Sequence, residues 1–180
     1  MADEKWDVSG GLALLLAGML VILPLQWTTA IILSAAVHEM GHWLAIFLLT
    51  GRGVGVRLSA SGARISLPEM QPWQECVCAL AGPMAGLSLL LLARWMPRTA
   101  ICALGHSVYN LLPIYPQDGG RALLCLLTMV MAPRKAEFIC KHCQILCKCF
   151  LLLLACYSAF RYQLGLLPLV IVCILLFRTK

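Results

Sequence analysis

Charged residues are scarce in this chain. They make up 12% of its 180 residues, against about a quarter in typical soluble domains. Hydrophobic residues reach 61% and the mean hydropathy is +0.87, which excludes a sizeable soluble domain and indicates an integral membrane protein. The net charge of +6 comes from Lys and Arg residues scattered through short segments, so a nucleic-acid-binding patch is also excluded.

A secretory signal and internal repeats are lacking as well. Residues 1–9 are polar and slightly acidic, and no small-residue cleavage site follows them. We therefore expect one transmembrane domain, residues 1–180, without an appended soluble domain.

Apolar runs predict about six transmembrane segments. The fourth is interrupted by two prolines and two glycines within residues 113–120, so we expect a broken helix there. At membrane depth such a backbone survives only inside protein or along a water-filled cavity, which predicts a site. The segments are 10–25, 28–50, 73–95, 100–131 (halves 101–112 and 121–131), 139–160 and 164–177.

Between the second and third segments, apolar and polar residues alternate. The alternation runs through Val54, Val56 and Leu58, and again over residues 63–67 after a Ser/Gly turn. Period-two alternation predicts a β-hairpin, while an irregular loop fits so short a stretch equally well. The expected fold class is an all-α polytopic membrane protein with this possible hairpin.

Lys and Arg are unequally divided between the two sides of a six-span topology. Nine lie on the side that holds both termini and the possible hairpin, three lie on the other, and two lie within spans. The positive-inside rule then places both termini in the cytoplasm.

Three ionisable residues lie in the middle of the second segment. His38 and His42 are one helical turn apart and point the same way, with Glu39 in the adjoining sector. This H-E-x-x-H arrangement is typical of zinc sites in which the Glu acts as general base. The alternative is a pair of core histidines satisfied by neighbouring helices, with Glu39 paired to one of them.

A catalytic zinc ion needs a third protein ligand. Of the eight acidic residues, six lie in the tail or loops, which leaves Glu39 and Asp118 at membrane depth. Asp118 is therefore the predicted third ligand. Its alternative role is to cap a helix that starts at Gly119.

The third segment carries a small-residue face around a helix breaker. Gly82 and Gly86 are four residues apart and flank Pro83, which allows close helix packing and equally a substrate-facing role.

The ten cysteines show no extracellular disulfide framework. Three of them, Cys140, Cys143 and Cys147, share one helical face, which fits helix packing or metal ligation.

Two motifs together resemble those of a known family. His38-Glu39-Met40-Gly41-His42 and the stretch from Asn110 to Arg121 (NLLPIYPQDGGR) are similar to the motifs of the site-2 protease family of intramembrane zinc metalloproteases. Within that family they resemble the bacterial sporulation type, which processes a sigma factor. The similarity covers residues 28–131.

The resemblance implies particular roles and an activity. It implies a bacterial cytoplasmic membrane protein that hydrolyses a peptide bond of a membrane-protein substrate, with Asn110 as an oxyanion donor. The implied zinc ligands and base are His38, His42, Asp118 and Glu39. The family often carries Asn where this chain has Gly86, and we expect no nucleotide-sensing or peptide-binding domain.

The predicted hairpin also suggests how a substrate would be recognised. A helical substrate must unwind before cleavage, and the predicted hairpin, with Val54, Val56 and Leu58, would pair with the unwound stretch.

The alternatives to a protease are a membrane metal transporter, a metal sensor or a catalytically silent scaffold. Glu39 beside the ligands argues for hydrolysis, since transport gives it no role. The oligomeric state is not predicted.

Overall fold

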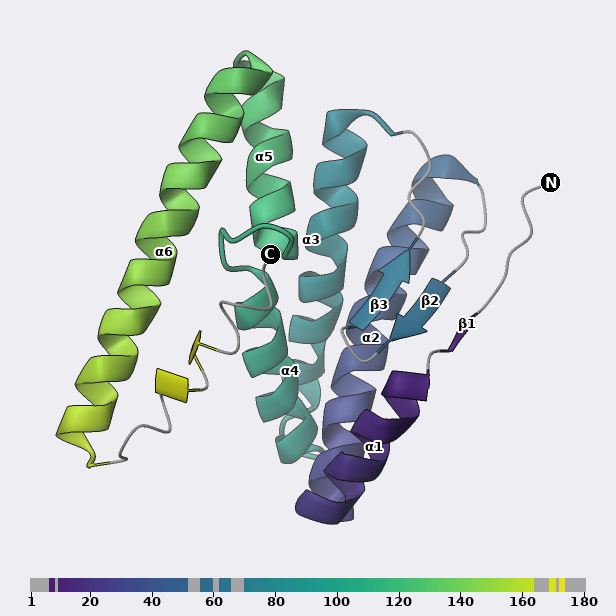
Figure 1. The fold of residues 1–180 in the computed structure, drawn as a ribbon. Coiled ribbons are helices and arrows are strands. Elements are labelled where there is room, and N and C mark those ends of the chain that lie inside the picture. Colours follow the sequence, from purple (N-terminus) through teal and green to yellow (C-terminus); the bar gives the residue numbers. More distant parts are fainter. Residues whose placement is uncertain are drawn as a thin grey trace. The chain divides into compact units, whose positions relative to one another are not determined.

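A computed structural model gives the fold as two compact units, residues 1–109 and 110–180. The first contains β1 (Asp7–Val8), α1 (Gly10–Ile22), α2 (Leu25–Thr50), β2 (Val56–Ser59), β3 (Gly62–Ile65), α3 (Pro72–Ser88), the 3-10 helix η1 (Leu89–Leu92) and α4 (Pro97–Asn110) up to Tyr109. The second contains α5 (Asp118–Val130) and α6 (Pro133–Arg161) (Figure 1). The described residues are 7–8, 10–51, 56–59, 62–65, 70–163, 169–170 and 172–173.

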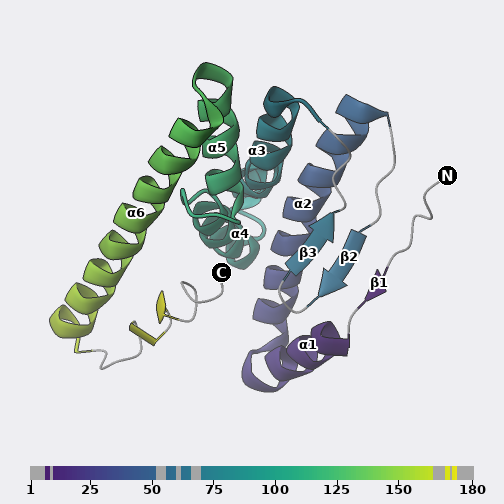
Figure 2. The same cartoon turned by 45° about the horizontal axis from the view of Figure 1, so that its top comes forward.

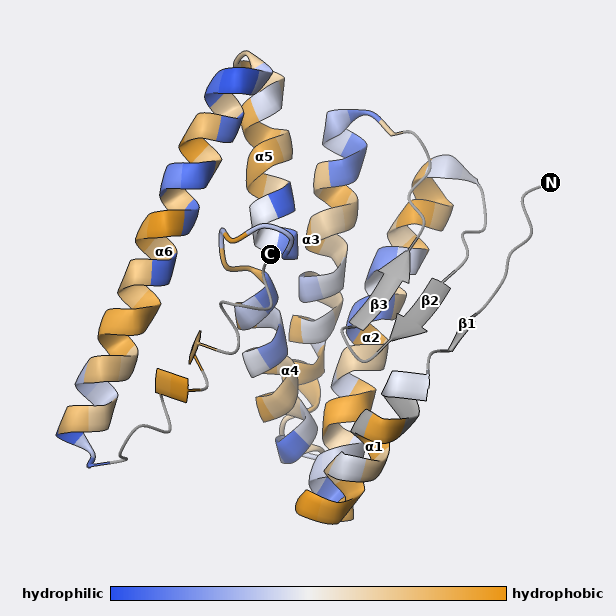
Figure 3. Cartoon of the chain, viewed as in Figure 1, coloured by the Kyte–Doolittle hydropathy of each residue, from blue (hydrophilic) through white to orange (hydrophobic). Residues whose placement is uncertain are grey.

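Three helical stretches in the described part of the chain are long and apolar enough to cross a membrane: α2, α3 with η1 (Pro72–Leu92), and α6. Their apolar character is evident in Figure 3. An all-α membrane fold is thus supported, while the six spans stay a prediction. The expected sixth segment, 164–177, lies mostly outside the described residues.

The ends of α2 and α3 follow from local sequence. Pro24 precedes α2 with extended backbone, so this helix begins at Leu25 rather than at residue 28. Gly51 closes α2 in the left-handed conformation (φ 64°) and donates its N–H to the Phe47 carbonyl. At the start of α3, Gln71 and Gln74 form a reciprocal capping box.

Helices α2 and α3 lie side by side (Figures 1 and 2). A Cβ placed on Gly41 would come within 2.6 Å of both the Ala81 carbonyl oxygen and the Ala85 Cβ. Only glycine therefore permits this spacing between the two helices. The close approach carries the backbone of α3 to the histidines of α2.

Three short strands form a sheet in the order β1-β2-β3. β2 and β3 pair antiparallel, from Val56 opposite Ile65 to Ser59 opposite Gly62. β1 pairs parallel with β2, with Val8 opposite Leu58. The alternating segment thus contains two paired strands, and β2 has a neighbour on each side. Val54 and residues 60–61 lie outside the described residues.

In the second unit, the expected break separates α4 from α5 at residues 111–117. A Cβ on Gly119 would overlap the Leu111 carbonyl, and one on Gly120 would come within 2.6 Å of the Ile114 backbone. The loop therefore folds back on the first turn of α5 because both positions lack side chains. Helix α5 begins at Asp118 with Gln117 in the N-cap position, one residue before the expected start at Gly119.

Candidate metal centre

His42 is fixed by a carbonyl of the neighbouring helix. Its Nδ1 lies 2.7 Å from the Cys78 carbonyl oxygen of α3, and the side chain is 8% exposed. A carbonyl can only accept, so Nδ1 carries the ring proton and Nε2 keeps its lone pair. The same hydrogen bond orients the ring so that Nε2 is available for metal binding.

His38 directs its own Nε2 toward that lone pair. The two Nε2 atoms are 3.2 Å apart, the rings stand at 82° to each other, and His38 is 3% exposed. Two nitrogen ligands of a tetrahedral zinc ion, each about 2.05 Å from it, lie about 3.3 Å apart. The histidine pair therefore fits the spacing that such an ion requires.

The glycines of α3 leave room for this pair. A Cβ on Gly82 would overlap the His42 ring, and one on Gly86 would overlap the Ser107 hydroxyl and lie 3.9 Å from His38 Nδ1. The packing interpretation of these glycines is thus supported by what surrounds them. Pro83 is also buried, and a substrate contact at any of the three positions stays a prediction.

His106 also lies against the histidine pair, although it belongs to neither of the two motifs. Its ring stacks on that of His38, with centroids 4.6 Å apart and an angle of 16° between the planes. Parallel rings direct their nitrogen lone pairs within separate planes, so His106 and His38 do not converge on one ion in this arrangement. The available signal was its position one turn before Asn110 in the helix that leads to the second motif.

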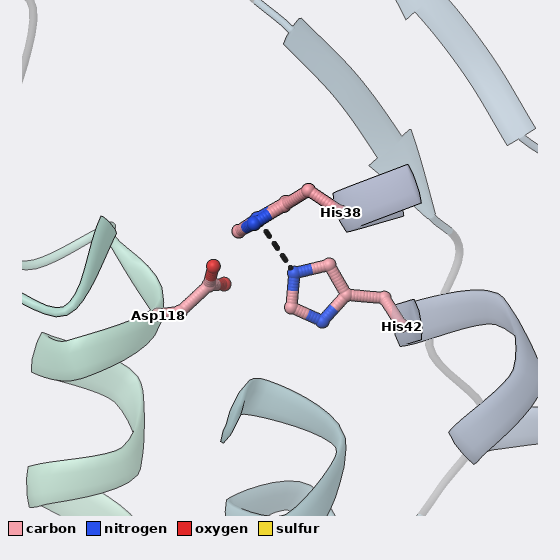
Figure 4. A group of neighbouring side chains, drawn as sticks. All are labelled: His38, His42 and Asp118. Atoms are coloured by element: carbon pink, nitrogen blue, oxygen red, sulfur yellow. Dashed lines mark hydrogen bonds between the residues drawn. The ribbon is translucent and has the colours of Figure 1, made fainter. Parts of the chain in front are cut away.

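Asp118 is the first residue of α5 and is 8% exposed. His38, His42 and Asp118 form a group whose potential ligand atoms all lie within 4.8 Å of one another (Figure 4). Two imidazole nitrogens and one carboxylate oxygen are a donor set that suits zinc. The three sequence-predicted ligands can therefore hold a metal ion. In the described part of the chain, no cysteine belongs to such a group.

Glu39 and Asn110 are both half-buried, one on α2 next to His38 and the other at the end of α4. Their roles as base and oxyanion donor remain predictions that rest on the motifs. Cys140, Cys143 and Cys147 lie half-buried on α6, which agrees with the packing interpretation.

Comparison with known proteins gives a likeness in structure alone. Neither the protein-family models nor the curated proteins match the sequence. Among solved structures, the site-2 protease from Methanocaldococcus jannaschii is similar, with a TM-score of 0.60 and 17% identity. The match covers 97% of this chain and 88% of that one. The chain therefore has the fold of a site-2 protease, while the sporulation branch stays a prediction.

Proposed function

We propose that this chain is an intramembrane zinc metalloprotease that hydrolyses a peptide bond within or near the transmembrane segment of a membrane-associated substrate. The observation that carries the proposal is the convergence of two buried imidazole nitrogens on an apolar helix, within 4.8 Å of a buried carboxylate. Ionisable groups are costly at this depth and are retained for function. We place the protein in a bacterial cytoplasmic membrane with both termini in the cytoplasm.

His38, His42 and Asp118 would hold the metal. The proton on His42 Nδ1, donated to Cys78, keeps Nε2 in its ligating form. Bound zinc would polarise the scissile carbonyl and acidify water. This donor set would leave a coordination position for substrate or water, as catalytic sites do.

Glu39 would take the proton from the attacking water and deliver it to the departing amine as the C–N bond breaks. Its place next to His38 on α2 puts it beside the ligands without making it one of them. Asn110 would donate its amide N–H to the oxyanion, a contribution of about 10²–10³ in rate.

Glu39→Gln tests the proposal most directly. The amide cannot accept the proton, so cleavage of labelled single-span peptides in proteoliposomes should be lost. The zinc content of the purified chain, measured by elemental analysis, should stay at the wild-type level. Cleavage that persists would refute the role of Glu39 as base. A wild-type protein without zinc, or one whose only activity is zinc flux that survives the substitution, would refute the protease assignment.

Substrate would bind by strand addition to the small sheet. β2 is flanked by β1 and β3, so a substrate strand on β2 must first displace β1. Among the described strands, the two outer edges of the sheet belong to β1, which has two residues, and to β3, residues 62–65, which offers the longer edge. We therefore propose that the substrate pairs with β3 rather than with Val56 and Leu58 of β2.

Two proline variants distinguish these edges. Val56→Pro disrupts the strand that supports β3 and should lower cleavage by about 10-fold without loss of zinc. Val8→Pro disturbs only β1 and should leave cleavage unchanged. Faster cleavage by the Val8 variant would assign the substrate to β2 instead, and unchanged cleavage by the Val56 variant would reject the strand role.

A further inference from the structure

Within the first unit, helix α4 contributes two neighbouring residues to the surroundings of the histidine pair. His106 lies flat against His38, and Ser107 lies against Gly86 of α3. Ser107 is fully buried, and its hydroxyl has no hydrogen-bond partner among the described residues. The second motif of the chain begins a few residues later, so neither residue is part of it.

The His38 ring needs an external restraint to serve as a ligand. Rotation about the Cβ–Cγ bond of histidine has broad minima, and Nε2 reaches the metal position in only part of that range. His42 is fixed by its bond to Cys78. On His38, the flat face of His106, at 4.6 Å between centroids and 16° between planes, sets the ring plane that directs Nε2 toward His42.

Gly86 determines how closely α4 approaches. A Cβ there would overlap the Ser107 hydroxyl, and its position is 3.9 Å from His38 Nδ1. The missing side chain therefore seats Ser107 in a notch beside the edge of the His38 ring. Because His106 precedes Ser107 on the same helix, this seat also sets the distance between the two stacked rings.

We propose that α4 positions His38, the first of the metal ligands. His106 orients the His38 ring by stacking on its face, and Ser107, which lies against Gly86, fixes the distance between the two rings. The inference rests on the proposed metal centre and adds to it two residues that neither binds the metal nor reacts with substrate. Residues that hold a metal ligand in place by hydrogen bonds contribute about 10–100-fold to metal affinity, and we expect an effect at the lower end of this range for a stacked ring.

The test compares four variants of the full-length chain in detergent. Zinc affinity is measured by competition with a chromophoric chelator, and ligand geometry by the visible absorption spectrum of the Co²⁺-loaded protein. His106→Ala should weaken zinc binding about 10-fold and change the Co²⁺ spectrum. His106→Phe keeps a flat ring and should bind within about 3-fold of wild type, with the wild-type spectrum.

His106→Gln has polar atoms but no ring, so it should resemble the alanine variant. If the alanine variant does not fold, the comparison of the Phe and Gln variants still shows whether the ring or the polar atoms of His106 support zinc binding. The matched control is His142→Ala, which removes an exposed histidine on α6 whose ring also contacts an aromatic side chain; its zinc affinity should be unchanged.

Three outcomes would overturn the inference. Tighter binding by the Gln variant than by the Phe variant would show that His106 acts through its nitrogens. Wild-type affinity and spectrum in the alanine variant would show that it has no positioning role. Absence of zinc binding by the wild type would remove the metal centre itself, so failure of the proposed function and failure of this inference are distinguishable.

Discussion

Helix α3, which packs beside the histidine-bearing helix α2, and α6, the longest of the described helices, bury their residues very differently. In the most apolar stretch of α3 and η1, 39% of residues are buried, against 6% in that of α6. The buried residues of α3 are small: Cys76, Cys78, Ala79, Gly82, Pro83 and Gly86. On α6 only Ala136 and Ala155 are buried, and large apolar side chains such as Phe150 and Leu153 are exposed.

The difference reflects what surrounds each helix. Small residues bring the backbones of α2 and α3 together, so backbone atoms and glycine surfaces enclose His42 and leave no room for lipid. Helix α6 instead exposes Leu and Phe side chains, which suit contact with acyl chains or another apolar surface. Apolar residues colour much of this helix orange in Figure 3. Substitutions that add one carbon should therefore be severe in the first region and mild where the structure is open.

Gly82→Ala is expected to have the largest effect on the centre. The added Cβ overlaps the His42 ring, so either the ring turns away or α3 withdraws together with the Cys78 carbonyl. Both movements misplace Nε2, and zinc affinity should fall by about 100-fold, at the upper end for residues that support a ligand. Chelator competition on the purified chain measures the loss.

The matched control is Gly105→Ala on α4, where a Cβ would meet nothing within 4 Å. Alanine is also the better helix former by about 0.5–1 kcal/mol. This variant should keep its zinc and gain slightly in thermal stability. Equal losses of zinc in the two variants would mean that helix packing in general, rather than the contact with His42, supports the centre.

The site was predictable from sequence where its geometry is local. The spacing of His38 and His42 follows from one helical turn, and Asp118 followed from the scarcity of acidic residues at membrane depth. The stack of His106 on His38 depends on the approach of α4, which a glycine distant in sequence permits. A single sequence does not reveal which helix fills such a notch.

The fold shows the same division between local and tertiary effects. The break before α5 was predicted because two prolines and two glycines leave no helical alternative. The third segment was expected to run to residue 95, but it changes to 3-10 geometry over Leu89–Leu92. No proline or glycine marks this change. The addition of β1 to the sheet also could not be predicted, because two residues are too short to show a period.

The smallest expected effect is on stability, and it compares a buried residue near the histidines with an exposed residue of α6. Ile46 is 1% exposed, packs with Cys78 and lies one turn after His42, whereas Leu153 of α6 is 69% exposed. Ile46→Ala should cost about 2 kcal/mol, since it leaves a cavity beneath the carbonyl that holds His42. Leu153→Ala removes little internal packing and should cost less than about 0.5 kcal/mol. Chemical unfolding of both variants in one mild detergent measures the difference, and similar losses would mean that α6 is packed against protein on the face that the structure leaves open.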